Sequence, residues 1–176
     1  MRRSALILVA CGIGLGGLAV DQLVKLASVA FLTPGVPVPI VGDLLQLQLI
    51  RNPGAAFGMG SSATIVFTIL AMVATLACLF VVLPRVNRIW QAVVAGLFLA
   101  GITGNLVDRI FQPPAALHGH VIDMFSLRGF AIFNVADMCI TGAAVLIIWL
   151  SVVRQVSADG RRMDAGEQEA RGRASS

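Results

Sequence analysis

The sequence contains few charged residues. Only 12% of its 176 residues are charged and 57% are hydrophobic, and its mean hydropathy is +0.89. A soluble domain carries about a quarter of its residues as charged side chains. This shortage excludes an ordinary soluble domain and indicates a membrane protein.

Cysteine and histidine are also scarce. The three cysteines, Cys11, Cys78 and Cys139, lie in three different apolar stretches, which favours small buried hydrophobic residues over a disulfide framework. The two histidines, His118 and His120, are in one loop. Together with Asp123 they resemble part of a metal site, but no further ligand has suitable spacing and no H-E-x-x-H motif is present.

A serine-hydrolase motif of the form G-x-S-x-G is absent as well. We therefore expect neither metal, nor cofactor, nor a catalytic serine. The glycines in "GIGLGG", Gly14, Gly16 and Gly17, lie in an apolar stretch, where they favour close helix packing over nucleotide binding.

Four uncharged stretches are long enough, or nearly so, to cross ~30 Å of hydrocarbon as helices. They are residues 4–20, a span within 65–83, 89–107 and 138–153. The first and the last reach full length only by including Asp21 or Asp137. The sequence therefore predicts an all-α membrane protein with four transmembrane helices.

The basic residues predict the orientation of these helices. With four spans, nine of the thirteen fall on one side: Arg2, Arg3, Arg85, Arg88, Arg154, Arg161, Arg162, Arg171 and Arg173. The positive-inside rule makes that side cytoplasmic, so both termini are expected there. The basic residues do not cluster with aromatics, so we expect no nucleic-acid partner.

The two ends of the chain need separate interpretation. The start, "MRRSALILVAC", imitates a secretory signal ending in a lipoprotein processing box, but its apolar run before that box is too short. We interpret it as an uncleaved first span. Residues 1–156 are expected to form the four-helix domain, and residues 157–176 a disordered cytoplasmic tail.

The two segments on the outer side, roughly residues 28–62 and 109–133, carry strand patterns. Residues 45–49, "LQLQL", alternate with the period of a half-buried strand, and "GFAIFN" at 129–134 is a second candidate. Pairing of these two strands would satisfy backbone hydrogen bonds at the membrane edge. We expect a small extracytoplasmic β-strand element.

The predicted topology also gathers polar residues at the outer ends of the helices. These residues are Asp21, Lys25, Asn52, Asn105, Asp108, Arg109, Asp123, Asn134 and Asp137. Ionisable groups within a membrane are functional by default. We expect these side chains to meet in one cavity.

Asp123 and Asp137 suggest a carboxylate dyad. Two carboxyl groups close together in a low-dielectric site share a proton, so that one activates water while the other protonates the carbonyl oxygen and the leaving amine. Amide hydrolysis requires these two roles. The residues are too far apart in sequence to share one helix face, and only tertiary folding would bring them together.

Simpler interpretations remain for each of these residues. Asp21 and Lys25 have the i, i+4 spacing of a helical ion pair. Asp108 and Arg109 could form a local pair with interfacial anchoring. Asn134 or Asp137 could cap the fourth helix. A carrier or scaffold with buried ion pairs is the non-enzymatic alternative, although transport favours acids spread across the membrane depth.

Five motifs in order resemble those of the lipoprotein signal peptidases (signal peptidase II), aspartic peptidases of the bacterial inner membrane. They are "DQLVK" at 21–25, "RNPGAAFG" at 51–58, "GNLVDR" at 104–109, "HVIDMF" at 120–125 and "FNVAD" at 133–137. They cover most of the chain between Asp21 and Asp137. Any one is weak, but five in register are specific.

The resemblance implies an enzyme that removes the signal peptide of a diacylglyceryl-modified prolipoprotein, just before the lipidated cysteine. It implies that Asp123 and Asp137 are catalytic, that the site faces the extracytoplasmic side, and that substrate and membrane lipid are the partners. We expect a monomer. The remaining matched positions are implied to bind substrate or support the site: Asn52, Asn105, Asp108, Arg109, Asn134, Ala136, Asp21 and Lys25.

Overall fold

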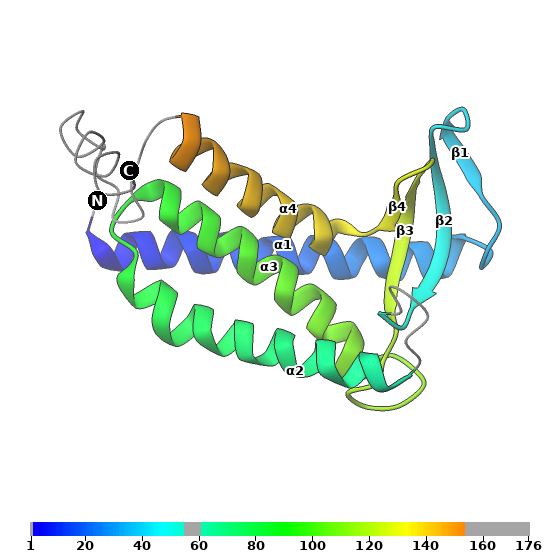
Figure 1. Ribbon diagram of the computed structural model, residues 1–176, viewed down its shortest axis with the longest axis horizontal. Helices are drawn as coiled ribbons and strands as arrows, with labels where there is room; N and C mark the ends of the chain where they lie inside the picture. The colour runs from blue at the N-terminus through cyan, green and yellow to red at the C-terminus, as the bar shows by residue number, and fades with distance from the viewer. Residues whose placement is uncertain (1, 55–60, 154–176) are drawn as a thin grey trace, which may run out of the picture.

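The structure is a computed structural model that describes residues 2–54 and 61–153. Four helices form a bundle with a small sheet at one end (Figure 1). The helices are α1 (Arg3–Phe31), α2 (Ser61–Ala77), α3 (Ile89–Phe111) and α4 (Val135–Ile148). The helix α2 continues through the π turn η2 (Cys78–Val82) and the 3-10 turn η3 (Leu83–Arg85), and α4 continues through the π turn η4 (Trp149–Val153).

The predicted four spans are confirmed. Helices long and apolar enough to cross a membrane cover Arg3–Phe31, Thr64–Arg85, Ile89–Phe111 and Val135–Val152. The first and last include Asp21 and Asp137, as their length required. The central helix is α3, because 44% of its most apolar window is buried in the protein, against 11% to 22% for the other three. Exposed leucine, isoleucine and valine side chains cover the outside of the bundle, as expected for a surface facing lipid.

Small residues let α1 and α3 approach closely. A Cβ atom on Gly17 would lie 2.6 Å from the Cβ of Ala100, and one on Gly14 would lie 3.4 Å from the Cβ of Leu99. The predicted packing role is therefore confirmed for Gly14 and Gly17. It is wrong for Gly16, where an added Cβ would have no neighbour within 4 Å.

The sheet lies at the end of the bundle away from the start of α1 and the end of α4 (Figure 1). Its four antiparallel strands, in the order β1-β2-β3-β4, are β1 (Val38–Val41), β2 (Leu45–Asn52), β3 (Val121–Leu127) and β4 (Ala131–Phe133). Leu49, Ile122 and Met124 form a buried cluster against Val24 of α1. This contact fixes the sheet on the end of the helices.

The two predicted strands exist as β2 and β4, but the expectation that they pair with each other is wrong. The strand β3 lies between them, pairing Ile50 with Asp123 on one side and Phe125 with Phe133 on the other. Residues 121–124 of β3 are buried one after another, so the strand lacks the polar–apolar alternation that reveals a half-buried strand. Asp123, for which the sequence predicted no strand, lies in β3. The predicted tail, residues 157–176, lies outside the described residues.

Candidate active site

A buried ion cluster forms the base of the site. The Nζ of Lys25 lies 2.8 Å from Oδ2 of Asp21 and 2.7 Å from Oδ2 of Asp108, and all three side chains are buried. Gln22 donates to Asp21 and to the carbonyl of Gly104. Buried charges are tolerated when they are paired and hydrogen-bonded, and here the pairing ties α1 to α3.

The two acids of this cluster also position the elements that carry the other aspartates. Oδ1 of Asp21 accepts a hydrogen bond of 2.8 Å from the backbone N–H of Ala136, at the start of α4. Oδ2 of Asp108 accepts one of 3.1 Å from the N–H of Ile122 in β3. Ala136 is itself fully buried. The cluster therefore holds the segments on which Asp123 and Asp137 lie.

Asn134 connects Asp123 and Asp137 directly. Its Nδ2 donates to Oδ1 of Asp123 at 2.6 Å, and its backbone N–H donates to Oδ2 of Asp137 at 3.2 Å. Its Oδ1 accepts from the N–H of Asp137 at 2.9 Å, which completes a capping box at the start of α4. The predicted cap is present, and the same residue joins the two carboxylates.

Two further asparagines complete the hydrogen bonding of the pair. Asn105 of α3 donates to Oδ1 of Asp137 at 2.8 Å and accepts from Asn134 and from Lys25. Asn52, the last residue of β2, donates to Oδ2 of Asp123 at 2.9 Å. Each carboxylate thus accepts from two different amide groups, and the network reaches the ion cluster through Lys25.

The environment changes the acidity of Asp123. The pKa of its carboxyl is raised from 3.8 to about 6, and the largest cause is burial. The charge of Asp137 raises this pKa as well, whereas the hydrogen bonds from Asn52 and Asn134 and the charge of Lys25 lower it. A pKa near the working pH suits a group that must both take and give a proton.

Arg109 follows Asp108 at the end of α3. In place of the alternative of a local Asp108–Arg109 pair, Asp108 forms its ion pair with Lys25. The guanidinium carbon of Arg109 lies 5.5 Å from the ring centroid of Phe67. Its Nη1 is buried and has no hydrogen-bond partner among the described residues, so it remains available as a donor.

The structure brings all ten predicted site residues to the end of the bundle that carries the sheet, and the i, i+4 ion pair of Asp21 and Lys25 is confirmed. Sequence reasoning missed Gln22, Thr64 and Thr68. Thr64 donates to the carbonyl of Pro53, and Thr68 donates to those of Thr64 and Leu117. The i, i+4 spacing of two threonines in an apolar span was the available signal.

His118 and His120 lie outside this hydrogen-bonded network. Within residues 2–54 and 61–153, no group of three histidine, cysteine or acidic side chains has the arrangement of a metal site. The side chains that bond to one another around the two aspartates are carboxylates, carboxamides and the amine of Lys25.

Four apolar helices, with hydrogen-bonded carboxylates gathered at one end, define a multi-pass membrane protein. The sequence model of the family described as Signal peptidase (SPase) II matches residues 13–153, and the chain belongs to this family. It is therefore a peptidase and a multi-pass protein of the bacterial inner membrane.

Individual relatives agree with this assignment. A lipoprotein signal peptidase of Mycobacterium avium (strain 104) is 43% identical over 135 residues, which cover 77% of this chain and 74% of the relative. One of Rhodococcus jostii (strain RHA1) is 40% identical over 149 residues, 82% of this chain and 72% of the relative. A solved structure of a bacterial membrane enzyme is similar with a TM-score of 0.70 and 26% identity, covering 85% of this chain and 93% of that one.

Proposed function

We propose that this protein is an aspartic endopeptidase that removes the signal peptide of diacylglyceryl-modified prolipoproteins, cleaving just before the lipidated cysteine. The observation that carries the aspartic mechanism is the double contact of Asn134, which binds Asp123 through its side chain and Asp137 through its backbone. Because one asparagine binds both carboxylates, we infer that they can act together on one water molecule. The prolipoprotein substrate is suggested by the family and by the names of the relatives.

In the proposed reaction, one aspartate of the pair is ionised and the other protonated. The ionised carboxylate takes a proton from water as the water oxygen bonds to the scissile carbonyl carbon. The protonated carboxyl gives its proton to the carbonyl oxygen, and the pair then delivers a proton to the amine nitrogen as the C–N bond breaks. The proton on the oxygen returns to the pair, which ends the cycle with one proton, as it began. A pKa of Asp123 raised to about 6 supports this exchange.

Arg109 is proposed to position the substrate. Its buried Nη1 lacks a partner among the described residues, and leaving such a donor unsatisfied costs about 1–3 kcal/mol or more for a charged group. A carbonyl oxygen of the bound peptide would supply the missing acceptor. The stacking of Arg109 on Phe67 would hold the guanidinium in place for that contact.

The proposed orientation of the protein in the membrane follows from the positions of its basic residues. Arg3 and Arg85 lie at the end of the bundle opposite the aspartates, and the positive-inside rule makes that end cytoplasmic. Both termini would then be cytoplasmic, and the aspartates would meet the substrate at the outer surface of the membrane. The diacylglyceryl chains of the substrate would remain among the membrane lipids. We also propose that the enzyme acts as a monomer.

The test is prolipoprotein cleavage by purified Asp123→Asn and Asp137→Asn variants. Each change keeps the size of the side chain but removes its ability to take up and release a proton, so each should reduce cleavage by at least ~10²-fold while substrate binding persists. The matched control is Asp43→Asn, an exposed aspartate of the sheet paired with Arg128, which should retain full activity. Full activity of either dyad variant would refute the mechanism.

Specificity needs a separate experiment, because a peptidase for unlipidated membrane spans could use the same aspartates. The same precursor is offered with and without diacylglycerol on its cysteine. We expect cleavage of the lipidated form alone. Equal cleavage of both forms would leave the aspartic mechanism intact and reject the proposed substrate.

A further inference from the structure

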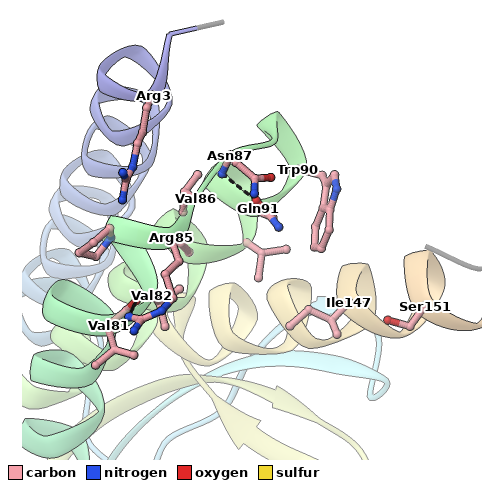
Figure 2. Close-up of a pocket in the computed structure, with 13 residues that line it drawn as sticks. Arg3, Val81, Val82, Arg85, Val86, Asn87, Trp90, Gln91, Ile147 and Ser151 are labelled. Carbon is pink, nitrogen blue, oxygen red and sulfur yellow. Dashed lines mark hydrogen bonds between the residues drawn. The ribbon is translucent and has the colours of Figure 1, made fainter. Parts of the chain in front are cut away.

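A second concave site lies at the opposite end of the bundle from the aspartates. It is a hollow of about 800 Å³, within the ~300–1,000 Å³ typical of ligand pockets. Its walls come from the first turn of α1, the turns η2 and η3, the start of α3 and the end of α4 with η4. Figure 2 shows Arg3 and Arg85 on one side and Trp90 with Ile147 on the other.

Most of the lining is apolar, as in a site that receives hydrocarbon. Val86 and Ala95 are buried in the protein, whereas Val81, Val82 and Ile147 remain 45% to 49% exposed. Trp90 extends along the wall (Figure 2). Tryptophan is enriched at the level of lipid head groups because its ring is apolar and its N–H is polar. The hollow therefore lies at the boundary between hydrocarbon and water.

The charge of the hollow is positive. Arg3 and Arg85 both line it, and Nη1 of Arg85 donates to the carbonyl of Val81 at 2.6 Å, which holds the guanidinium against the wall. Among the described residues, every carboxylate side chain lies in the sheet or at the sheet end of the bundle: Asp21, Asp43, Asp108, Asp123 and Asp137. No described acid thus neutralises the two arginines.

The helices beside the hollow are irregular. The π turn η2 supplies Val81 and Val82, and the π turn η4 supplies Ser151. Such turns are rare and frequently mark functional sites. Here they occur in the two helices that contribute opposite walls of the same hollow, which is a second observation that separates it from an ordinary gap between helix ends.

We propose that this hollow binds one anionic phospholipid, with the phosphate on Arg3 and Arg85 and an acyl chain along the valines and Ile147. A basic pocket between transmembrane helices at the head-group level has the chemistry of an anionic lipid site. Asn87 and Ser151 add polar groups for a glycerol hydroxyl. The site is independent of the peptidase reaction and would retain a lipid in the leaflet at this end of the bundle.

Fluorescence of Trp90 tests the proposal in the full-length chain. The chain has two tryptophans, so a Trp149→Phe variant leaves Trp90 as the reporter at the hollow. This variant is reconstituted in phosphatidylcholine vesicles with a rising fraction of dibrominated phosphatidylglycerol or, in parallel, dibrominated phosphatidylcholine. We expect the anionic lipid to reach half-maximal quenching at a lower mole fraction than phosphatidylcholine does. The expected difference is about fivefold for each arginine, the factor equivalent to ~1 kcal/mol per basic residue at a membrane surface.

The controls separate the two arginines from general surface charge. Arg3→Gln combined with Arg85→Gln should remove the preference for the anionic lipid, whereas Arg88→Gln, which removes an exposed arginine at the same end of the bundle outside the lining of the hollow, should retain it. Unchanged elution from a sizing column checks that each variant is folded. Equal quenching of the Trp149→Phe parent by the two lipids would overturn the proposal. Equal quenching is also the result expected if another part of the chain filled the hollow. Unbrominated phosphatidylglycerol and inorganic phosphate are then each added to compete with the brominated anionic lipid. If phosphate relieves the quenching as effectively as phosphatidylglycerol does, the site binds a soluble anion and the proposal is wrong.

Discussion

Asparagine is the residue that organises the aspartate pair. Asn52, Asn105 and Asn134 each donate an amide hydrogen to a carboxylate. A lysine or arginine in direct contact with the pair would favour the doubly ionised state, whereas a neutral amide orients the oxygens without adding charge. Lys25, whose charge acts on Asp123, is itself bound by Asp21 and Asp108. The pair is thus oriented by amides and left able to share a proton.

Loss of the Asn52 amide should change the pH dependence of cleavage. The hydrogen bond from Asn52 stabilises the ionised form of Asp123 and lowers its pKa, so Asn52→Ala should raise that pKa further above about 6. The limb of the pH–rate profile that reports Asp123 should therefore move to higher pH, whether the residue acts as base or acid. Gln48→Ala, which removes a side chain of the same strand bonded to Gly35, is the control. An unshifted limb in Asn52→Ala would contradict the assignment.

Asp123 should also make stability depend on pH. Its pKa is about 6 in the folded protein against an ordinary value of 3.8, so the folded state keeps a proton that the unfolded chain loses. The resulting stabilisation is complete below pH about 4 and is lost as the pH rises through about 6. The Tm of Asp123→Asn relative to the parent should therefore rise between these pH values and level off above them. Parallel thermal melts in detergent measure this difference, and a constant difference would show that Asp123 is not desolvated.

At the scale of elements, the site depends on how closely α3 approaches α1 and α4. A Cβ on Gly104 would lie 2.7 Å from Oδ2 of Asp21 and 3.0 Å from the Cβ of Ala136. One on Gly101 would meet Ile140 and, at 2.5 Å, the carbonyl oxygen of Ala136. Only glycine lets α3 bring Asn105 to Asp137 while Lys25 reaches Asp108. The close packing of α3 against α1 and α4 therefore also determines the geometry of the carboxylates.

Gly104→Ala should accordingly reduce both stability and activity. The added methyl group would collide with the buried Asp21 side chain, and overpacking of this kind costs about 1–3 kcal/mol. The control is Gly16→Ala on α1, where the new Cβ has no neighbour within 4 Å. That change should leave Tm unchanged or raise it, because alanine is about 0.5–1 kcal/mol better than glycine within a helix. Equal Tm values for the two variants would show that α3 has room to move.

At the scale of the whole molecule, the two ends of the bundle differ in charge. At the sheet end the described aspartates offset Lys25, Arg51, Arg109 and Arg128, whereas the other end carries Arg2, Arg3, Arg85 and Arg88 with no described acid (Figure 1). A membrane protein with this asymmetry is expected to insert with the arginine-rich end inside. The same asymmetry assigns the peptidase site and the proposed lipid site to opposite surfaces of the membrane.

Cysteine labelling tests the orientation. Arg128→Cys is at an exposed turn of the sheet, and Asn87→Cys is at an exposed position before α3. In intact bacterial cells with a permeable outer envelope, a membrane-impermeant thiol reagent should label the first variant and label the second only after the inner membrane is opened. The parent chain, whose cysteines lie in apolar spans, is the background control. The reverse pattern would invert the topology.

Local composition was enough to predict the four helices and one of the strands. Charge-free runs of about 20 residues must lie in hydrocarbon, and that requirement alone gave the four spans and the inclusion of Asp21 and Asp137. Alternation along residues 45–49 gave β2. Even the grouping of polar residues at one end followed, because consecutive spans alternate in direction.

The contacts between these residues could not be predicted without the folded chain. The insertion of β3 between β2 and β4, the bridge of Asn134 between Asp123 and Asp137, and the pairing of Lys25 with Asp108 all join segments distant in the chain. Strand β3 left no periodic signal, since its first residues are buried on both faces. Hydropathy is a property of each residue and can be calculated from the sequence. Strand order and side-chain contacts depend on the packing of surfaces that form only when the helices assemble.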